Sequence, residues 1–555
     1  MPFEAVAIQR RRIAVIGAGI SGMGAARMLS RDNDVTLIEA APRLGGHART
    51  VLAGKAGDQP VDTGFIVFNY ANYPLLTRLF DDLDVPVVKS DMSFGASVRG
   101  GRVEYGLTNL RAIFAQMRNV ASPRFIGMLR DVMRFNARAL EMSQEPGLTI
   151  GELLDALGTG VWFRDYYLLP LSGAIWSTPK DKILDFPAHA MIQFFENHAL
   201  LNHTGQHQWY TVEGGSVQYV DRLTEALRRD GVTIRRNTPV QGVRRTLIGA
   251  DVKTAGHGWE GFAVGGSWEP FDEVIFATHS DDTLRLLVDP SVDEASALSD
   301  IRYQPNQVVL HADDAAMPRN RLAWASWNYR EAEGREAAGE AGDSIDLTYW
   351  MNRLQPIPKD DPMFVTLNPT RRIDPAKIYD EVTLRHPVYD LAALRAQEEM
   401  RHINGRNNTW FCGAWMRNGF HEDGLASAME VATRLDAAAA AAAGGPLRGA
   451  VGWGPSPPIT MALSASWVKG KLFRVSLAPA KPLFCIYADI LGTGARGRSP
   501  TGFDTASIMS SSMRRASRTL RRFLHATGPA LSLFTTATTA ARRNRAGGRL
   551  GCARC

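Results

Sequence analysis

Cysteine is scarce in this chain of 555 residues, with four in all: Cys412, Cys485, Cys552 and Cys555. Four cysteines in this length give no disulfide framework, so we expect a reducing compartment, the cytoplasm. Only Cys552 and Cys555 have the spacing of a metal-binding pair, and no second pair accompanies them. The sequence therefore predicts no metal site.

Long hydrophobic runs are also missing. The longest uncharged stretch, residues 449–468, contains three prolines, which a plain membrane-spanning helix does not accommodate. Arg10–Arg12 precede an apolar run as in a signal peptide, but that run continues into regularly spaced glycines. We therefore predict no membrane-spanning segment.

Acidic residues are rare in the C-terminal part. Residues 446–555 hold 17 Lys and Arg against Asp489 and Asp504, a net charge of +15, so residues 1–445 carry 46 minus 55, or −9. A nucleic-acid footprint on the folded body is not expected, because its charge is negative. We predict an Ala/Gly linker and a basic, disordered tail over 437–555. Two alternatives are a basic helix at 510–524 that contacts anionic lipid, a peripheral membrane contact, and a frameshift after Asp489.

The N-terminal residues are typical of a dinucleotide-binding βαβ unit. A predicted strand at 13–16 leads into Gly17, Gly19 and Gly22, then a helix to about residue 30 and a strand at 35–39. These glycines allow a tight turn, a close approach of the backbone to a pyrophosphate, and close packing of helix on strand. Ile20 and Ser21 open the helix, whose free N–H groups favour phosphate.

Glu39 ends the second strand, 20 residues after Gly19. Its carboxylate is suited to accept hydrogen bonds from a ribose diol and repels a 2′-phosphate, which disfavours NADP. The unit alone leaves NAD and FAD open.

The chain is too long for a single hydrophobic core, so we predict a second lobe that is interleaved with the first in the sequence. The apolar spacing is helical over 75–140 and 150–195, and mixed over 286–400. We predict an α/β fold, in which a Rossmann-like dinucleotide-binding domain (1–90, 205–285 and 400–436) is interleaved with an α+β substrate domain (91–204 and 286–399).

The stretch that begins at Glu39, Glu-Ala-Ala-Pro-Arg43-Leu-Gly45-Gly46, resembles the signature of the flavin amine oxidase superfamily. The resemblance implies FAD, whose adenosine ribose and diphosphate this stretch contacts in the family. It also implies that the Rossmann-like domain is an FAD-binding domain of the amine oxidase type. The arginine usual after the glycine pair is His47 here, with Arg49 two residues further on. Which side chain compensates the diphosphate is left open.

Further resemblances extend to about residue 435. Asp62-Thr-Gly64-Phe is similar to a segment beside the flavin, and Val240 stands where the family makes a backbone contact to adenine. Motifs such as Ile175-Trp-Ser-Thr-Pro are similar to those of a bacterial group of oxidoreductases associated with cyclopropane and branched fatty acid synthesis. That resemblance implies a lipid or other small-molecule substrate and a fatty-acid methyltransferase as partner.

The segment from Gly413 to residue 424 corresponds to the family's flavin-binding strand and helix start. Relatives carry an acidic residue where this chain has Ala414, so Glu422 or Asp423 is expected to supply that carboxylate. The catalytic residues stay unknown, and three candidates are His421, Glu422 and Trp176. His421 is an acid/base candidate or only a helix cap, and Trp176 lines a pocket or packs in a core.

The sequence thus predicts an FAD-dependent oxidoreductase that transfers a hydride from an apolar substrate, such as a fatty-acyl chain, to flavin N5. One alternative is an amine oxidase. It is weakened because Trp415 and Phe420 stand where amine oxidases often place tyrosines. Another alternative is a non-catalytic flavin- and lipid-binding accessory of the methyltransferase.

Overall fold

The structure is a computed structural model, which describes residues 10–145, 147–178, 180–202, 206–255, 266–331 and 346–442. The chain divides into two units, Met1–Gly452 and Trp453–Cys555, and the fold below is that of the described residues of the first. The predictions for the basic tail, the 510–524 helix and the frameshift lie outside the described residues.

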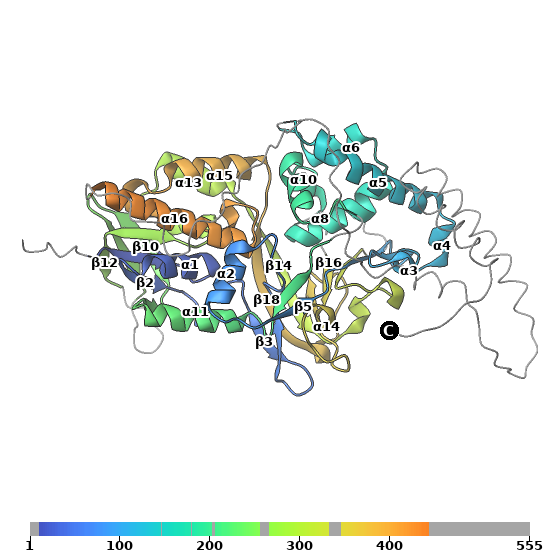
Figure 1. The fold of residues 1–555 in the computed structure, drawn as a ribbon, viewed down its shortest axis with the longest axis horizontal. Coiled ribbons are helices and arrows are strands. Elements are labelled where there is room, and N and C mark those ends of the chain that lie inside the picture. Colours follow the sequence, from blue (N-terminus) through green and yellow to red (C-terminus); the bar gives the residue numbers. More distant parts are fainter. Residues whose placement is uncertain are drawn as a thin grey trace, which may run out of the picture. The chain divides into compact units, whose positions relative to one another are not determined.

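A five-stranded parallel sheet forms the first lobe (Figure 1). Its strands in spatial order are β19 (Thr409–Phe411), β13 (Glu273–Phe276), β1 (Arg12–Ile16), β2 (Asp34–Ile38) and β9 (Thr233–Arg235). Residues 13–16 of β1 are all buried, as expected for a central parallel strand covered on both faces. The predicted βαβ unit is therefore present and central.

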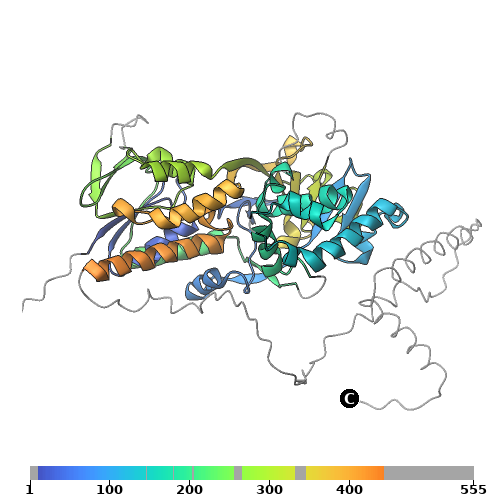
Figure 2. The same ribbon diagram turned by 90° about the horizontal axis from the view of Figure 1, so that it is seen from above.

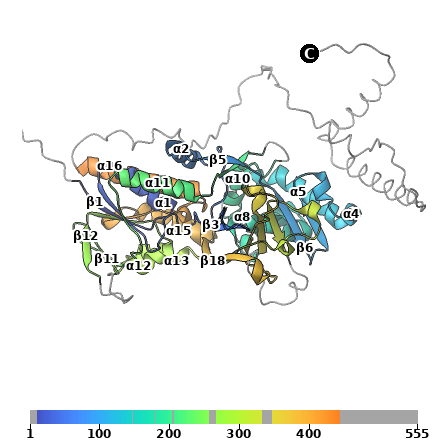
Figure 3. The same cartoon turned by 90° about the horizontal axis from the view of Figure 1, so that it is seen from below.

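Helices cover both faces of this sheet (Figure 3). On one face α1 (Ile20–Leu29) contacts α11 (Val217–Arg229) and α16 (His421–Ala442). On the other, α13 (Val292–Asp300) and α15 (Leu391–Ile403) share a core with buried residues of the sheet. A three-stranded antiparallel sheet joins that core, with β10 (Val240–Arg245), β11 (Ala250–Thr254) and β12 (Trp268–Phe271).

A seven-stranded mixed sheet forms the second lobe. Its strands in spatial order are β18 (Ile378–Pro387), β14 (Tyr303–His311), β17 (Phe364–Leu367), β16 (Asp346–Trp350), β15 (Trp327–Arg330), β6 (Phe94–Val98) and β7 (Val103–Gly106). β14 and β18 pair over most of their length and extend toward the first lobe (Figure 1).

Helices from residues 110–197 pack with this sheet in one large core (Figures 1 and 2). They include α5 (Pro123–Met142), α6 (Ile150–Leu157), α8 (Leu169–Trp176) and α10 (Ala188–Asn197). The short helices are α3 (Leu110–Ile113), α4 (Met117–Val120), α7 (Val161–Phe163), α9 (Lys180–Ile183) and α14 (Met351–Leu354). Thr149 and Glu152 form a capping box that fixes the start of α6.

Two-stranded ribbons connect the lobes. They are β3 (Thr50–Ala53) with β4 (Gln59–Asp62), and β5 (Val87–Ser90) with β8 (Trp209–Val212). Helix α2 (Pro74–Asp82) precedes β5, and α12 (Ser280–Leu286) follows β13. The division into FAD-binding and substrate domains at the boundaries given above stays a proposal.

The prediction of a helical run over 75–140 was wrong between residues 87 and 106, where β5, β6 and β7 lie. Every residue of β6 and β7 is buried. A strand buried on both faces lacks the polar alternation that distinguishes a strand from a helix, so the spacing of its apolar residues was misinterpreted.

Candidate functional site

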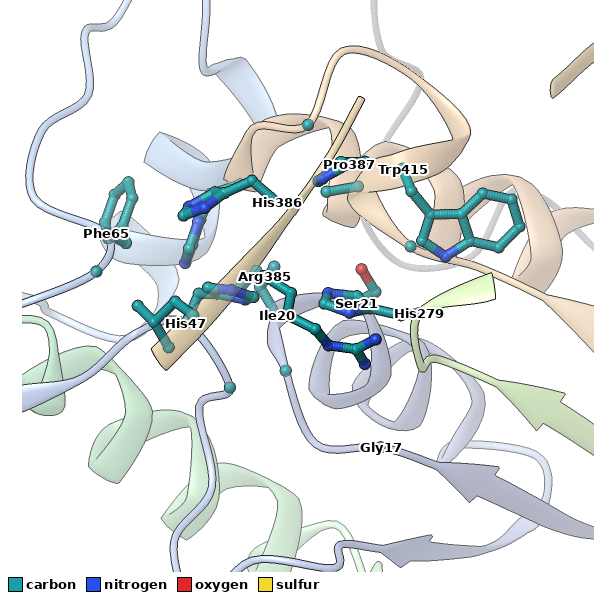
Figure 4. A pocket seen from close by; sticks show the side chains of 18 of the residues that line it. Gly17, Ile20, Ser21, His47, Phe65, His279, Arg385, His386, Pro387 and Trp415 are labelled. Carbon is teal, nitrogen blue, oxygen red and sulfur yellow. The ribbon is translucent and has the colours of Figure 1, made fainter. Parts of the chain in front are cut away.

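One cavity of about 780 Å³ lies between the parallel sheet and the seven-stranded sheet. Its volume is in the range of small-molecule and cofactor sites. Figure 4 shows part of its lining around the start of α1. The cavity-lining segments on the side of the parallel sheet are 16–21, 38–40, 45–47, 64–67, 238–240, 277–279, 413–415 and 419–421.

The glycine turn between β1 and α1 is shaped by close backbone contacts. Gly17 has φ +98°, and a Cβ on it would lie 2.8 Å from the carbonyl oxygen of Ala277. A Cβ on Gly22 would lie 1.8 Å from the carbonyl oxygen of Gly17. Gly19 has room, since its nearest neighbour would be Gly46 Cα at 4.0 Å. Gly17 and Gly22 thus make the turn, whereas Gly19 leaves space above it.

The Gly45-Gly46 pair packs against this turn. The Gly45 N–H donates to the Ala18 carbonyl at 2.8 Å, and a Cβ on Gly46 would approach Gly19 Cα to 3.0 Å. Arg43 donates to the carbonyls of Leu44, Gly46 and Ala48 and does not line the cavity. Its guanidinium therefore holds the loop.

Glu39 lies beside the turn, as the sequence predicts. Its carboxylate accepts the Ala18 N–H at 2.7 Å and the Ala41 N–H at 2.9 Å. Each carboxylate oxygen keeps a further lone pair, so Glu39 can also accept hydroxyl groups of a ribose. Val240 lines the cavity at the start of β10.

The Asp62–Phe65 segment closes another wall. A Cβ on Gly64 would lie 2.0 Å from the His47 carbonyl oxygen, and the Phe65 N–H donates to that carbonyl at 2.9 Å. Asp62 is buried behind the wall and accepts hydrogen bonds from Ser216, Thr50 and Gln355. Burial raises its pKa to about 6, although these hydrogen bonds oppose the shift.

The segment between β19 and α16 brings Gly413 to the cavity, and His421 at the start of α16 also lines it. His421 stacks on Phe65 with ring centroids 3.8 Å apart, and its Nε2 lies 3.1 Å from the Tyr219 hydroxyl. Burial lowers the pKa of His421 to about 3, so its imidazole is neutral at pH 7. Asp423, rather than His421, caps α16, because its carboxylate accepts the Phe420 N–H at 3.0 Å.

Glu422 does not line the cavity. Its carboxylate accepts the N–H groups of Leu75 and Leu76 at the start of α2, both at 2.9 Å. Burial raises its pKa to about 7. The structure therefore directs Glu422 toward α2, and Asp423 and Gly22 are likewise outside the lining. Their predicted contacts with a cofactor stay predictions.

Four more histidines line the cavity, and three of them, His47, His279 and His386, form a cluster. The His47 ring lies 5.7 Å from His279 and 5.5 Å from His386 between centroids (Figure 4). Burial lowers the pKa of all three, to about 3 for His279 and His386, so they are neutral at pH 7. His47 Nε2 and His279 Nδ1 are buried without a hydrogen-bond partner among the described residues.

The far end of the cavity is lined by apolar and aromatic side chains of the second lobe. Phe194 stacks on Phe420 at 5.0 Å and on His198 at 3.8 Å, and Trp209 stacks on His198 at 6.2 Å. Trp176 does not line the cavity; it packs behind Phe194 at 4.9 Å, in the core. The apolar lining at this end is Met92, Ile175, Phe194, Trp209, Trp327 and Phe420.

Sequence reasoning missed the lining residues His279, Arg285, Arg385 and His386. His279 follows the parallel strand β13, and the carboxyl end of a parallel strand is a usual place for ligand contacts. No local pattern marks Arg385 and His386, because they end a strand of the other sheet.

The chemistry of this lining fits a flavin adenine dinucleotide. The turn at α1 presents backbone N–H groups free of side chains, Glu39 offers ribose acceptors, and two orphaned imidazole nitrogens have hydrogen-bonding capacity left. The sequence matches the flavin containing amine oxidoreductase family over residues 20–354, more than half of the chain. The chain belongs to this family. It is an oxidoreductase whose cofactor is FAD.

Solved structures share the fold at low sequence identity. A fatty acid isomerase from P. acnes matches with a TM-score of 0.52 and 16% identity, over 76% of this chain and 98% of its own. A putrescine oxidase variant gives 0.55 and 16%, over 77% and 99%. A reduced UDP-galactopyranose mutase gives 0.54 and 14%, over 77% and 95%. No curated protein matches the sequence at a significant level.

Two observations concern the predictions of no metal site and no membrane-spanning segment. His279, Asp281 and Asp282 place ligand atoms within 4.8 Å of one another, but arginines already bind both carboxylates. Among the described residues, no helix is both long and apolar enough to cross a membrane.

Proposed function

We propose that this flavoprotein oxidises a C–H bond of an apolar substrate and that a fatty-acyl chain is the favoured class. The observation that carries the proposal is the apolar and aromatic lining of the far end of the cavity. Each buried CH₂ group of an acyl chain would contribute about 0.8 kcal/mol against such a wall. When bound, the flavin supplies an acceptor for hydride at N5.

The distribution of charge around the cavity supports an uncharged reacting group. The carboxylates in the described lining, Glu39 and Asp282, belong to the cofactor end. At the apolar end, burial lowers the pKa of His198 to about 4, so its imidazole is neutral at pH 7. An alkylammonium would find no counter-ion there, and burying an unpaired charge is costly.

Tyr349 and Ser177 are polar side chains in this otherwise apolar part of the lining. Both line the cavity, and a hydrogen bond joins their side chains. Burial keeps the pKa of Tyr349 well above its usual value, so its hydroxyl remains protonated. We assign to Tyr349 the donation of a hydrogen bond to the polar end of the substrate, which leaves the chain to pack along the aromatic rings.

The similar solved structures support two substrate classes. One similar structure is a fatty acid isomerase, in line with a lipid, and another is a putrescine oxidase, which makes an amine the second candidate. A third candidate is a flavin-bound lipid carrier that serves a fatty-acid methyltransferase. The aromatic wall is compatible with each, but the lack of a carboxylate at that end favours the lipid.

Anaerobic reduction of the bound flavin separates these candidates. The purified yellow protein is mixed without oxygen with long-chain fatty acids, or with putrescine and cyclohexylamine. We expect loss of the yellow absorbance with a fatty acid only. Bleaching by an amine alone would establish an amine oxidase, and an unchanged spectrum with a lipid that nevertheless binds would favour the carrier.

A further inference from the structure

A diphosphate bound at the start of α1 carries negative charge that the protein has to compensate. A diphosphate placed there receives backbone N–H groups and the partial positive end of the helix. A side-chain cation would add charge-assisted hydrogen bonds, which are about twice as strong as neutral ones. Five side chains are candidates: Arg43 and Arg49, which flank the Gly45-Gly46 pair in the sequence, and Arg285, Arg385 and His47, which line the cavity.

Three of these candidates are unsuited, two because they lie outside the cavity lining and one because it carries no charge. Arg43 is occupied by loop carbonyls, as described above, and does not face the cavity. Arg49 binds both oxygens of Asp380 at 2.7 and 3.0 Å and is also outside the lining. His47 lines the cavity, but its imidazole is neutral. The position that follows Gly45-Gly46 therefore provides no cation.

Two arginines remain in the lining, Arg285 and Arg385. The side chain of Arg285 is 66% exposed and pairs with Asp282 on its own helix α12, so water screens its charge. The side chain of Arg385 is 33% exposed and comes from β18, a strand of the seven-stranded sheet. We propose that Arg385 is the side-chain cation that faces the diphosphate of FAD in this protein.

The surroundings of Arg385 position its guanidinium before any ligand binds. Two of its nitrogens donate to Asp281 and Asp282 in the first turn of α12, and its Cζ lies 5.5 Å from the centre of the Tyr303 ring. A guanidinium has five N–H donors in a rigid fork, so two carboxylate contacts leave others for a phosphate. Figure 4 labels Arg385, His47 and His279 in the same lining as Ile20 and Ser21 at the start of α1.

This inference rests on FAD as cofactor and not on the substrate proposed above. Failure of one therefore leaves the other standing. It also means that a strand of the second lobe completes the cofactor site of the first.

Flavins with and without phosphate provide the test. The full-length protein is stripped of flavin and titrated with FAD or riboflavin, with flavin fluorescence as the readout. For Arg385→Gln we expect the Kd for FAD to rise roughly 10- to 100-fold, as expected for the loss of hydrogen bonds to a charged group. The Kd for riboflavin should stay within about twofold, because riboflavin has no phosphate to lose.

Two further variants keep the result interpretable. Arg385→Met retains the aliphatic stem, and circular dichroism of both variants verifies the fold. Arg49→Gln is the matched control: it breaks another partly buried arginine–aspartate pair that involves β18, and it should leave the ratio of the two Kd values unchanged. Equal weakening of FAD and riboflavin by Arg385→Gln, no weakening at all, or a FAD-selective loss in Arg49→Gln would overturn the proposal.

Discussion

The two ends of the cavity are built in different ways. The cofactor end uses backbone from residues 16–21, 38–40 and 45–46, where glycines and one carboxylate set the geometry. The apolar end uses side chains from separate segments: Met92, Ile175, Phe194, Trp209, Trp327 and Phe420. A site made of backbone depends on local spacing, whereas a wall of side chains depends on how distant segments pack.

The largest expected effect tests the backbone end. Gly22→Ala places a Cβ 1.8 Å from the Gly17 carbonyl oxygen, so the turn has to move. We expect the protein to lose its flavin and about 2–4 kcal/mol of unfolding free energy. Denaturant unfolding of the stripped protein and flavin content after gel filtration measure the two effects.

Gly19→Ala is the matched control for that turn. Its Cβ would have 4.0 Å to the nearest atom, so the stripped protein should keep its stability while FAD affinity falls. Equal stability losses in Gly19→Ala and Gly22→Ala would show that the turn does not distinguish the two glycines.

The second effect concerns Glu422, which sequence reasoning assigned to the cofactor end. Its pKa of about 7 in the folded protein exceeds its ordinary value of 4.5, so the folded state binds more protons between these pH values. Stability is therefore lost as pH rises from about 4.5 to 7. Relative to Glu422→Gln, we expect the wild type to lose roughly 1–3 kcal/mol between pH 5 and pH 8.

Urea unfolding of both stripped proteins at the two pH values measures this difference. Flavin content should be similar in the two, since Glu422 faces α2. A difference in stability that does not change with pH would contradict a buried, protonated Glu422.

The smallest effect tests the side-chain end. Phe420→Ala removes a half-buried ring that stacks on Phe194, and we expect KM for a fatty-acyl substrate to rise about tenfold with flavin content unchanged. Phe420→Leu, which keeps most of the apolar contact, should raise KM by less. Flavin loss in Phe420→Ala would contradict the assignment of this ring to the apolar end of the cavity.

The difference between the ends also explains what the sequence could predict. The βαβ unit was predicted correctly, and Glu39 and the Gly45-Gly46 pair lie beside its turn, because these positions follow from spacing within about 30 residues. The strands at 94–106 were missed because burial on both faces hides their periodicity. Arg385 and His386 were missed because only the pairing of β18 with β14 brings them to the cavity.

The long pair β14 and β18 has a consequence for engineering. Tyr303 begins β14 and Arg385 nearly ends β18, and residues 383–387 of β18 line the cavity. A chimera that exchanges the second lobe for that of a relative would therefore also exchange part of the cofactor's enclosure. Selecting such chimeras for a new substrate would have to begin with whether they remain yellow.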